Sequence, residues 1–291
     1  MDLQLDQLRT LTSVIDNGSF EAAARAMRIT PSAVSQRVKA LEQQVGRVLL
    51  RRAKPARLTD SGLVVMKLAR QVQLLERDAA AALGPTESDF TSVALGVNAD
   101  SLATWLLPAL AEVANVSFDL YLADQDHSAA LLREGTVMAA VTSDPEPVQG
   151  CTVTRLGSMR YRAMATPEFA AKWMPRGPTT DALAGAPMLV FDRRDSLQDR
   201  YLAVRSRKVL TPPRHCLPAS TQFVTAVTLG LGWGMLPDAQ ANDLLADGHL
   251  VVLDTEHTID VPLYWQQWAL DSPSLASIAD AVGRAAARSL R

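Results

Sequence analysis

The chain has 291 residues, 48% of them hydrophobic, and a formal net charge of −2, which allows one large domain or two to three small ones and excludes a protein that is basic throughout. It has no apolar run of the ~18 residues that a membrane span needs, and its first residues are not typical of a signal peptide. The two cysteines, Cys151 and Cys216, are far apart and the four histidines are scattered, so we expect a cytoplasmic protein with no disulfide framework, metal site or cofactor.

The N-terminal segment predicts three short helices. In "LDQLRTLTSVIDNG" the aliphatic residues recur at helical spacing until Asn17-Gly18 ends the pattern. Ser19 suits the N-cap of a second helix. Thr30 and Pro31 suit the start of a third, because a proline at the first helical position loses no hydrogen bond.

The third helix is amphipathic. Val34, Val38, Leu41 and Val45 fall on one face, and small polar and basic residues fall on the other. A short helix that follows a tight turn and has an open polar face is typical of a helix-turn-helix, whose second helix enters the DNA major groove. Hydroxyls at a helix start suit phosphate, and glutamine suits adenine. In the motif from Phe20 to Lys39 we therefore predict contacts to a double-stranded DNA operator from Pro31, Ser32, Ser35, Gln36, Arg37 and Lys39.

The next stretch, "VLLRRAKPARLT", predicts a small basic wing. It adds Arg51, Arg52, Lys54 and Arg57 to the predicted DNA-binding residues. From Arg28 to Asp60 there are eight basic and two acidic residues, so this part is positively charged while the rest of the chain is acidic. A basic N-terminal segment in an otherwise acidic chain indicates that this segment binds a polyanion. A solvated amphipathic helix pair is the alternative interpretation.

The stretches "FEAAARAM", "ITPSAVSQRVKALEQQVGRVLLRR" and "RLTDSG" together resemble the N-terminal domain of LysR-type transcriptional regulators over residues 4–62. The resemblance implies an α/β protein in three parts. These are an all-α winged helix-turn-helix domain (1–60), a linker and dimerisation helix (61–89), and a two-lobed effector-binding domain similar to periplasmic binding proteins (90–291). One lobe would comprise 90–160 and 266–291, and the other 161–265.

The linker segment predicts a helix with a heptad seam. Its members are Val65, Leu68, Val72, Leu75, Ala79 and Ala82, and Gly84-Pro85 ends the helix. The seam favours a homodimer, because two DNA half-sites need two reading heads at a fixed separation. A helix packed on its own domain is the alternative, and the resemblance implies a homotetramer as the higher assembly.

From Ser92 onward strands and helices alternate. "SVALGVN", "SFDLYLA" and "VMAAVT" are typical of strands, whereas "DSLATWLLPALAEV" and "SAALLREG" are typical of helices. This order implies a mostly parallel sheet covered by helices. A second alternating block follows residue 160 and contains "MLVF", "STQFVTAVTLGLG", "GMLP" and "HLVVLD", then "VPLYWQQWAL" and a last helix over 274–290. The resemblance implies crossings between the lobes near 160 and 265.

Ligands of such sheets bind outside the carboxyl ends of the strands, here between the lobes. Helix starts with hydroxyls suit a carboxylate, and acids at other strand ends suit a cation. We therefore predict an effector site made of Asn98, Asp100, Ser101, Asp124, Asp126, Thr142, Asp192, Ser220 and Thr221. Each acid could instead be an N-cap or a solvated loop residue.

"NADSLATWLLPAL" and "LYWQQW", with "CTVTRLG", "GLGWGMLP" and "MRYRAMATP", resemble the branch of the family that senses lysine and arginine and activates a basic-amino-acid exporter gene. The resemblance implies an activator with L-lysine or L-arginine as effector and RNA polymerase as a possible partner. One segment differs from the pattern of this branch. After the second strand the branch is expected to have glutamate beside the aspartate, whereas this chain has Ala123-Asp124-Gln125-Asp126. The choice among lysine, arginine, histidine and another effector therefore stays open.

Other functions remain alternatives. An enzyme could use Ser101, Asp126 and His127, but the chain has no G-x-S-x-G elbow, so we expect no enzyme. An exported solute-binding protein would leave residues 4–60 unexplained. A chromosome-binding protein of the replication-inhibitor type, without an amino-acid effector, stays open.

Overall fold

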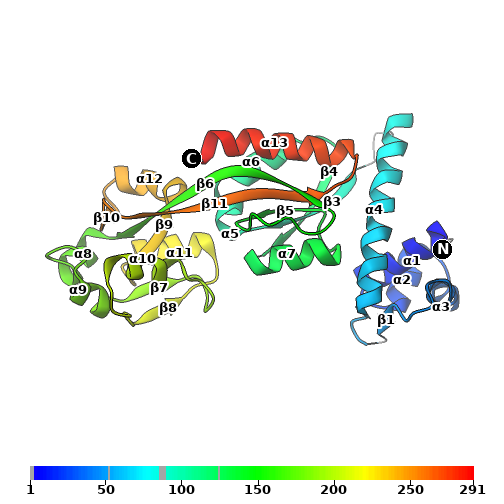
Figure 1. The fold of residues 1–291 in the computed structure, drawn as a ribbon, viewed down its shortest axis with the longest axis horizontal. Helices are drawn as coiled ribbons and strands as arrows, with labels where there is room; N and C mark the ends of the chain where they lie inside the picture. The colour runs from blue at the N-terminus through cyan, green and yellow to red at the C-terminus, as the bar shows by residue number, and fades with distance from the viewer. Residues whose placement is uncertain (1–2, 52, 85–89, 124) are drawn as a thin grey trace.

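The computed structural model describes residues 3–51, 53–84, 90–123 and 125–291, and for 125–127 only the backbone. Figure 1 shows a small helical domain, one upright helix and an elongated α/β domain. The N-terminal domain consists of α1 (Leu5–Asp16), α2 (Phe20–Met27), α3 (Pro31–Val45) and a hairpin of β1 (Leu50–Arg51) and β2 (Arg57–Leu58). The predicted winged helix-turn-helix is therefore confirmed.

The predicted helix starts are also confirmed. The Ser19 hydroxyl accepts a hydrogen bond from the N–H of Ala22 at 3.1 Å, and the Thr30 hydroxyl accepts one from the N–H of Ala33 at 3.1 Å. Between α1 and α2, Gly18 has a φ of 73°, a left-handed conformation that glycine adopts without strain. These local features fix the tight turns that bring the three helices together.

The long helix α4 (Asp60–Leu83) begins directly after the wing, where the Thr59 hydroxyl caps it. At Gly62 the backbone of α4 lies against the carbonyl group of Leu49, so any Cβ at this position would collide with it. The first turn of α4 is therefore packed closely on the wing, and the N-terminal domain and α4 form one unit.

The residues of the predicted heptad seam on α4 lie in two different environments. Val65 is buried in the core of the N-terminal domain, as the alternative interpretation expected for the whole helix. Leu68 and Leu75 are each 40% exposed. The remaining seam residues are Val72, which is half-buried, and Ala79 and Ala82, which are exposed. An apolar stripe therefore remains on α4 for a partner to cover.

The C-terminal domain is built on one curved sheet with strand order β10-β6-β11-β5-β3-β4, in which β9 also pairs with β6. Strand β3 pairs in parallel with β4 and β5, as the alternation predicted. The expectation of a mostly parallel sheet is wrong beyond these three strands, because β6 and β11 are long and run antiparallel to each other. The strands are β3 (Thr91–Val97), β4 (Val116–Leu122), β5 (Ala139–Thr142), β6 (Cys151–Ala165), β9 (Gly234–Pro237), β10 (Val251–Val252) and β11 (Thr258–Trp268).

Strands β6 and β11 connect two lobes. In the first lobe β11 pairs with β5 over residues 264–267, and in the second lobe β6 pairs with β9 over residues 161–164. The chain thus passes from one lobe to the other within β6 and returns within β11. A small parallel pair, β7 (Met188–Val190) and β8 (Arg214–Cys216), lies in the second lobe.

Helices cover the sheet on both sides, with α13 and α6 on one face and α7 on the other (Figure 1). The helix predicted to follow β3 is one run of α5 (Ala99–Ser101), the π-helix η1 (Leu102–Leu106) and α6 (Leu107–Ala111). The others are α7 (Gln125–Glu134), α8 (Pro167–Trp173), α9 (Thr180–Gly185), α10 (Leu197–Arg205), α11 (Ser220–Thr228), α12 (Asp238–Ala246) and α13 (Pro273–Ser289).

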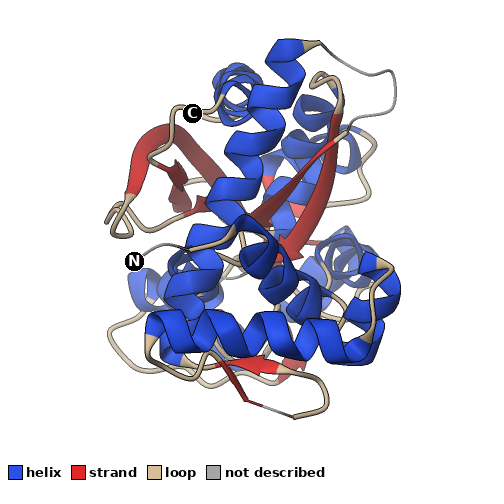
Figure 2. Cartoon of the chain, turned by 90° about the vertical axis from the view of Figure 1, so that its right-hand side faces the viewer, coloured by secondary structure: helices blue, strands red, loops and turns tan. Residues whose placement is uncertain are grey.

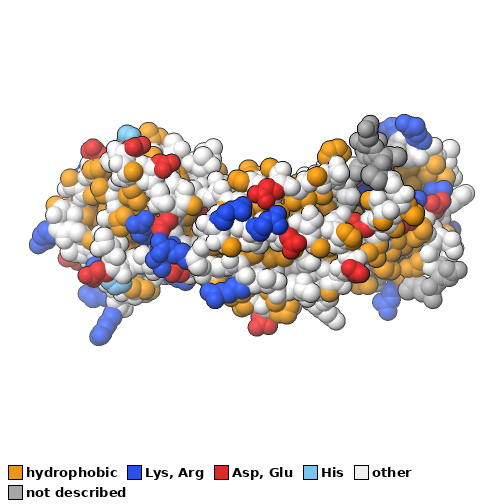
Figure 3. All heavy atoms as spheres, turned by 90° about the horizontal axis from the view of Figure 1, so that it is seen from above, with side chains coloured by type: hydrophobic (Ala, Val, Ile, Leu, Met, Phe, Trp, Pro, Cys, Tyr) orange, Lys and Arg blue, Asp and Glu red, His pale blue; other side chains and the backbone are white. Residues whose placement is uncertain are grey.

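Acidic and basic side chains are interspersed over the α13 face in Figure 3. Among the described residues no helix is both long and apolar enough to cross a membrane.

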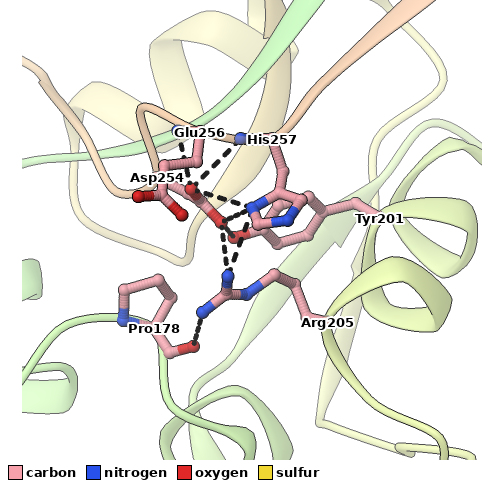
Figure 4. A network of polar contacts seen from close by, with 6 residues as sticks. All are labelled: Pro178, Tyr201, Arg205, Asp254, Glu256 and His257. Carbon is pink, nitrogen blue, oxygen red and sulfur yellow. Dashed lines mark hydrogen bonds and ion pairs between the residues drawn. The ribbon is translucent and has the colours of Figure 1, made fainter.

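A buried carboxylate holds the second lobe together. Asp254, whose side chain is 5% exposed, accepts hydrogen bonds from the Tyr201 hydroxyl at 3.1 Å and from the N–H groups of Glu256 and His257 (Figure 4). The guanidinium of Arg205 lies 3.3 Å away. Burial raises the pKa of Asp254, but the two backbone donors and Arg205 outweigh it, so the pKa lies below its usual value.

We expect Asp254→Ala to lower the free energy of unfolding by roughly 3 kcal/mol, because it removes the carboxylate that pairs with Arg205 and that accepts the hydrogen bond from the Tyr201 hydroxyl. Urea unfolding measures the loss, and Asp247→Ala, on an exposed turn, is the control and should stay within about 0.5 kcal/mol of the unchanged chain. A carboxylate with a lowered folded pKa stabilises above its unfolded pKa of about 3.9. The difference in the free energy of unfolding between the unchanged chain and Asp254→Ala should therefore narrow as the pH falls below that value.

Candidate functional site

The structure has two candidate sites, and the first is the surface of α3. The aliphatic face of the helix is buried in the N-terminal core, as predicted. On the opposite face Pro31, Ser32, Gln36 and Lys39 are exposed, and Ser35 is half-buried. The open face therefore presents hydroxyl, amide and ammonium groups, which are the groups that read base edges and phosphates.

The hairpin adds basic side chains to this surface. Arg51, Lys54 and Arg57 are exposed, and Figure 2 shows the hairpin at the edge of the N-terminal domain. Arg52, the fourth basic residue predicted in the wing, lies outside the described residues. Exposed basic groups on a wing next to an open helix suit the phosphates that flank a major groove.

Two acidic residues position this surface. Arg37 is partly neutralised, because its guanidinium lies 3.4 Å from the carboxylate of Asp6. The carboxylate of Glu42 accepts a hydrogen bond from the N–H of Leu49 at 2.8 Å, which ties α3 to the wing. The two parts of the DNA-facing surface are thus held in a fixed arrangement.

The second candidate site is a cavity of about 750 Å³ lined by residues of both lobes. Its size lies within the ~300–1,000 Å³ typical of small-molecule pockets. Five residues of the predicted effector site line it, namely Asn98, Asp100, Thr142, Asp192 and Ser220. They come from the carboxyl ends of β3, β5 and β7 and from the start of α11, as expected for a sheet of this kind.

Asp100 joins the two lobes. One carboxylate oxygen accepts a hydrogen bond from the Tyr161 hydroxyl at 2.7 Å, and the other accepts one from the Ser220 hydroxyl at 2.6 Å. Gln240 in turn donates to the Ser220 oxygen at 2.9 Å. Burial and the charge of Asp100 raise the pKa of Tyr161 well above its usual value, so the phenol stays a neutral donor. The hydroxyl predicted to receive a ligand carboxylate thus donates to a carboxylate of the protein.

A second carboxyl group lies near Asp100. Burial raises the pKa of Asp195 above its usual value, N–H groups of Phe191 and Leu197 lower it in part, and the charges of Asp100 and Asp192 raise it further. Mutual repulsion of this kind means that a cation placed among the three carboxylates would be stabilised. This side of the cavity is therefore suited to a positively charged group.

Asp192 also shapes its own turn. It accepts hydrogen bonds from the N–H groups of Arg194 at 2.7 Å and Asp195 at 2.9 Å, as the loop interpretation of this acid expected. Arg193 and Arg200 line the same cavity. Acids and bases thus both face the cavity, which suits a dipolar ligand.

Two polar atoms beside the cavity have no hydrogen-bond partner among the described residues. They are the hydroxyl of Ser143 and the side-chain oxygen of Gln198, and Gln198 is only 1% exposed. An unpaired buried polar atom costs free energy, so such atoms next to a cavity favour a ligand or water that pairs with them.

Four residues of the predicted effector site are not placed in the cavity lining. Ser101 is fully buried, and its hydroxyl has no partner among the described residues. Thr221 is exposed on α11. Asp124 and the side chain of Asp126 lie outside the described residues. Their roles stay predictions, and no group of His, Cys, Asp or Glu in the described part of the chain is arranged to hold a metal ion.

The sequence interpretation missed Tyr161, Asp195, Gln198 and Gln240. Asp195 could have been found, because "FDRRD" carries a second acid three residues after Asp192. The other three become site residues only through the pairing of β6 with β9 and the packing of α10 and α12. No local pattern in the sequence marks them.

Comparison with known proteins identifies the two domains. Residues 5–63 match the family of bacterial regulatory helix-turn-helix proteins of the lysR family, and residues 88–287 match the LysR substrate binding domain. The HTH-type transcriptional regulator LysG of Mycobacterium tuberculosis is 47% identical over 100% of this chain and 96% of its own length. The lysine export transcriptional regulatory protein LysG of Corynebacterium glutamicum is 45% identical over 98% of both chains.

A solved structure is similar over the full length. Full-length LysG of Corynebacterium glutamicum with bound effector Arg has a TM-score of 0.80 and 43% identity, and the match covers 99% of both chains. The two family matches follow each other along the chain, and the similar proteins extend over both of them. The chain therefore belongs to the LysR family of bacterial helix-turn-helix transcriptional regulators.

Proposed function

We propose that this chain is a cytoplasmic activator that binds L-lysine or L-arginine between its lobes and switches on a gene for the export of basic amino acids. It would bind an operator as a homodimer or homotetramer, recruit RNA polymerase and catalyse no reaction. The observation that carries the effector assignment is the group of three carboxylates, Asp100, Asp192 and Asp195, at a cavity that arginine and serine residues also line. LysG of Corynebacterium glutamicum supports the same class of effector and gene, because its name refers to lysine export and its full-length structure has the effector Arg bound.

The proposed pose follows from the charges around the cavity. The cationic groups of the amino acid would lie among Asp100, Asp192 and Asp195, where they relieve the repulsion between the carboxylates. Asp100 keeps lone pairs for an ammonium group, because a carboxylate can accept about four hydrogen bonds and the described residues donate two. The α-carboxylate would pair with the hydroxyl of Ser143 or with Arg193 or Arg200, which also line the cavity.

Titration calorimetry of the full-length protein with arginine and lysine tests the proposal. We expect saturable binding, and Asp100→Asn should weaken it by about 10–150-fold, because one hydrogen bond to a charged group is worth about 1.5–3 kcal/mol. Asp280→Asn, an exposed residue of α13, removes the same charge away from the cavity and should leave the binding unchanged. Citrulline, which is close to arginine in shape and has no side-chain charge, should bind more weakly than arginine.

The proposal fails if neither arginine nor lysine binds the unchanged protein at millimolar concentration. In that case a different effector, or DNA binding without an amino-acid effector, becomes the better interpretation. The gene assignment has its own test, which is sequencing of the DNA that the protein occupies in its native cell. The occupied DNA should lie upstream of a gene for an amino-acid exporter, and arginine or lysine should raise its transcription.

A further inference from the structure

Arg70 contacts three parts of the molecule at once. It lies in the middle of α4, and its side chain is 16% exposed. One guanidinium nitrogen donates to the carbonyl oxygens of Gly135 at 2.8 Å and Thr136 at 2.9 Å, in the C-terminal domain. The other donates to Asp16 at 3.0 Å, the last residue of α1 in the N-terminal domain. A single side chain thus links α4 and both domains.

The contact with Gly135 leaves no spare room. Gly135 has a φ of 73°, and a Cβ there would lie 2.7 Å from the Cα of Lys67 on α4. Lys67 itself donates to the carbonyl oxygen of Gln149 at 3.2 Å. The turn at 135–136 is therefore packed directly on the backbone of α4, and a small displacement of either part must move the other.

This turn leads directly to the cavity. Three residues after Thr136 the chain enters β5, and β5 ends at Thr142, which with Ser143 lines the cavity. Val137 and Ala140 lie in the same small buried cluster, so the turn and the strand move as one packed unit. Along the chain, little more than this one short strand separates the cavity-lining end of β5 from the turn that contacts Arg70.

The other side of Arg70 leads to the DNA-facing surface. Besides the contact with Asp16, helix α1 is tied to α4 by a hydrogen bond from Gln73 to Thr12 at 2.8 Å. Helices α2 and α3 pack on α1 in one core. A rotation of α4 against the C-terminal domain would therefore carry α3 with it.

We propose that Arg70 is the positioning residue that couples the inter-lobe cavity to the DNA-binding helix, by holding α1 and α4 against the turn that starts β5. The coupling part of this inference rests on the function proposed above. The clamp itself, made of Arg70, Asp16 and the turn at 135–136, does not depend on which effector binds.

The first test measures the clamp without any effector. Fluorescent labels are placed on cysteines introduced at Gln44 and Ser277, both exposed, in a full-length chain whose Cys151 and Cys216 are replaced by serine. Labelled chains are diluted in an excess of unlabelled chains, so that each assembly holds one labelled copy. Arg70→Gln should shift and broaden the distribution of energy-transfer efficiencies measured on single molecules. A distribution equal to that of the unchanged protein overturns the inference.

The second test measures coupling with arginine and an operator selected by the full-length protein from a randomised duplex library. In the unchanged protein we expect arginine to change the operator Kd, or the bend of the bound operator, with coupling of the usual 5–150-fold order. Arg70→Gln should reduce the effect on Kd to less than about twofold and abolish any change in bend. Its Kd for arginine should stay within about twofold of the unchanged value, because Arg70 does not line the cavity.

Two further variants separate coupling from simple loss of structure. Gly135→Ala acts on the other side of the clamp and should also reduce the coupling. Arg9→Gln breaks an ion pair between α1 and α4 that does not reach the C-terminal domain, and it should leave the coupling intact. Undiminished coupling in Arg70→Gln overturns the inference, whereas an unchanged protein that does not bind arginine refutes the proposed effector and leaves the decision on the clamp to the distance measurement.

Discussion

Replacing Leu68 and Leu75 of α4 by glutamate is expected to give a folded chain that no longer dimerises and that loses operator affinity by more than about 100-fold. Both side chains are 40% exposed in the single chain, so the substitutions leave its own core intact. In a dimer formed through this stripe, the substitutions would bury like charges in an apolar seam, which costs several kcal/mol. Two separate reading heads would then bind one half-site each, and the advantage of a joined pair, commonly 10²–10⁴-fold, would be lost.

Light scattering and operator titration measure the two parts of this prediction. Ala80→Glu with Ala81→Glu is the matched control, because both residues are exposed on α4 and lie off the seam. The control should stay dimeric and bind the operator normally. A stable dimer of the Leu68 and Leu75 variant would place the interface elsewhere.

Replacing Arg51 and Arg57 together by alanine is expected to weaken binding to all DNA sequences by roughly 100-fold or more near 100 mM salt. Both side chains are exposed on the wing, where they can approach phosphates on either side of the groove that α3 enters. A dimer presents each residue twice, so up to four phosphate contacts disappear. The slope of log K against log salt should therefore become shallower by about 0.9 for each lost contact.

Gln36→Ala provides the contrast, because Gln36 lies on the exposed face of α3 and is uncharged. It should cost about 1–3 kcal/mol at one base pair and leave the salt slope unchanged. Binding of both variants to a randomised duplex library, read by sequencing at several salt concentrations, measures preference and slope together. A steep, unchanged slope in the Arg51 and Arg57 variant would exclude the wing from phosphate binding.

The N-terminal domain was predictable because its signals are local. The Ser19 and Thr30 hydroxyls each accept a hydrogen bond from an N–H group three residues later. The aliphatic residues of α3 recur every three to four positions. The seam of α4 was predicted in position but not in environment. Val65 faces the core of its own domain, and only the packing of α4 on the wing at Gly62 decides that.

The cavity was predictable in place but not in detail. Asp100 and Ser220 could be marked from strand ends and helix starts, yet their hydrogen bond spans 120 residues and depends on how β6 brings the lobes together. Tyr161 enters the site for the same reason, since its neighbours along the chain give no sign of the carboxylate it meets. The long strands β6 and β11 also made the sheet mixed, which the βαβ alternation alone does not reveal.

If the inter-lobe cavity controls how the protein holds DNA, arginine binding and operator binding must be linked. The Kd for arginine is measured for the free full-length protein and for the protein bound to its selected operator, and the bend of that operator is followed by energy transfer between its ends. We expect either that the two Kd values differ by the same factor by which arginine changes the operator Kd, as linkage requires, or that arginine changes the bend at constant affinity. Equal Kd values together with an unchanged bend at saturating arginine would contradict the claim that this cavity controls how the protein holds DNA.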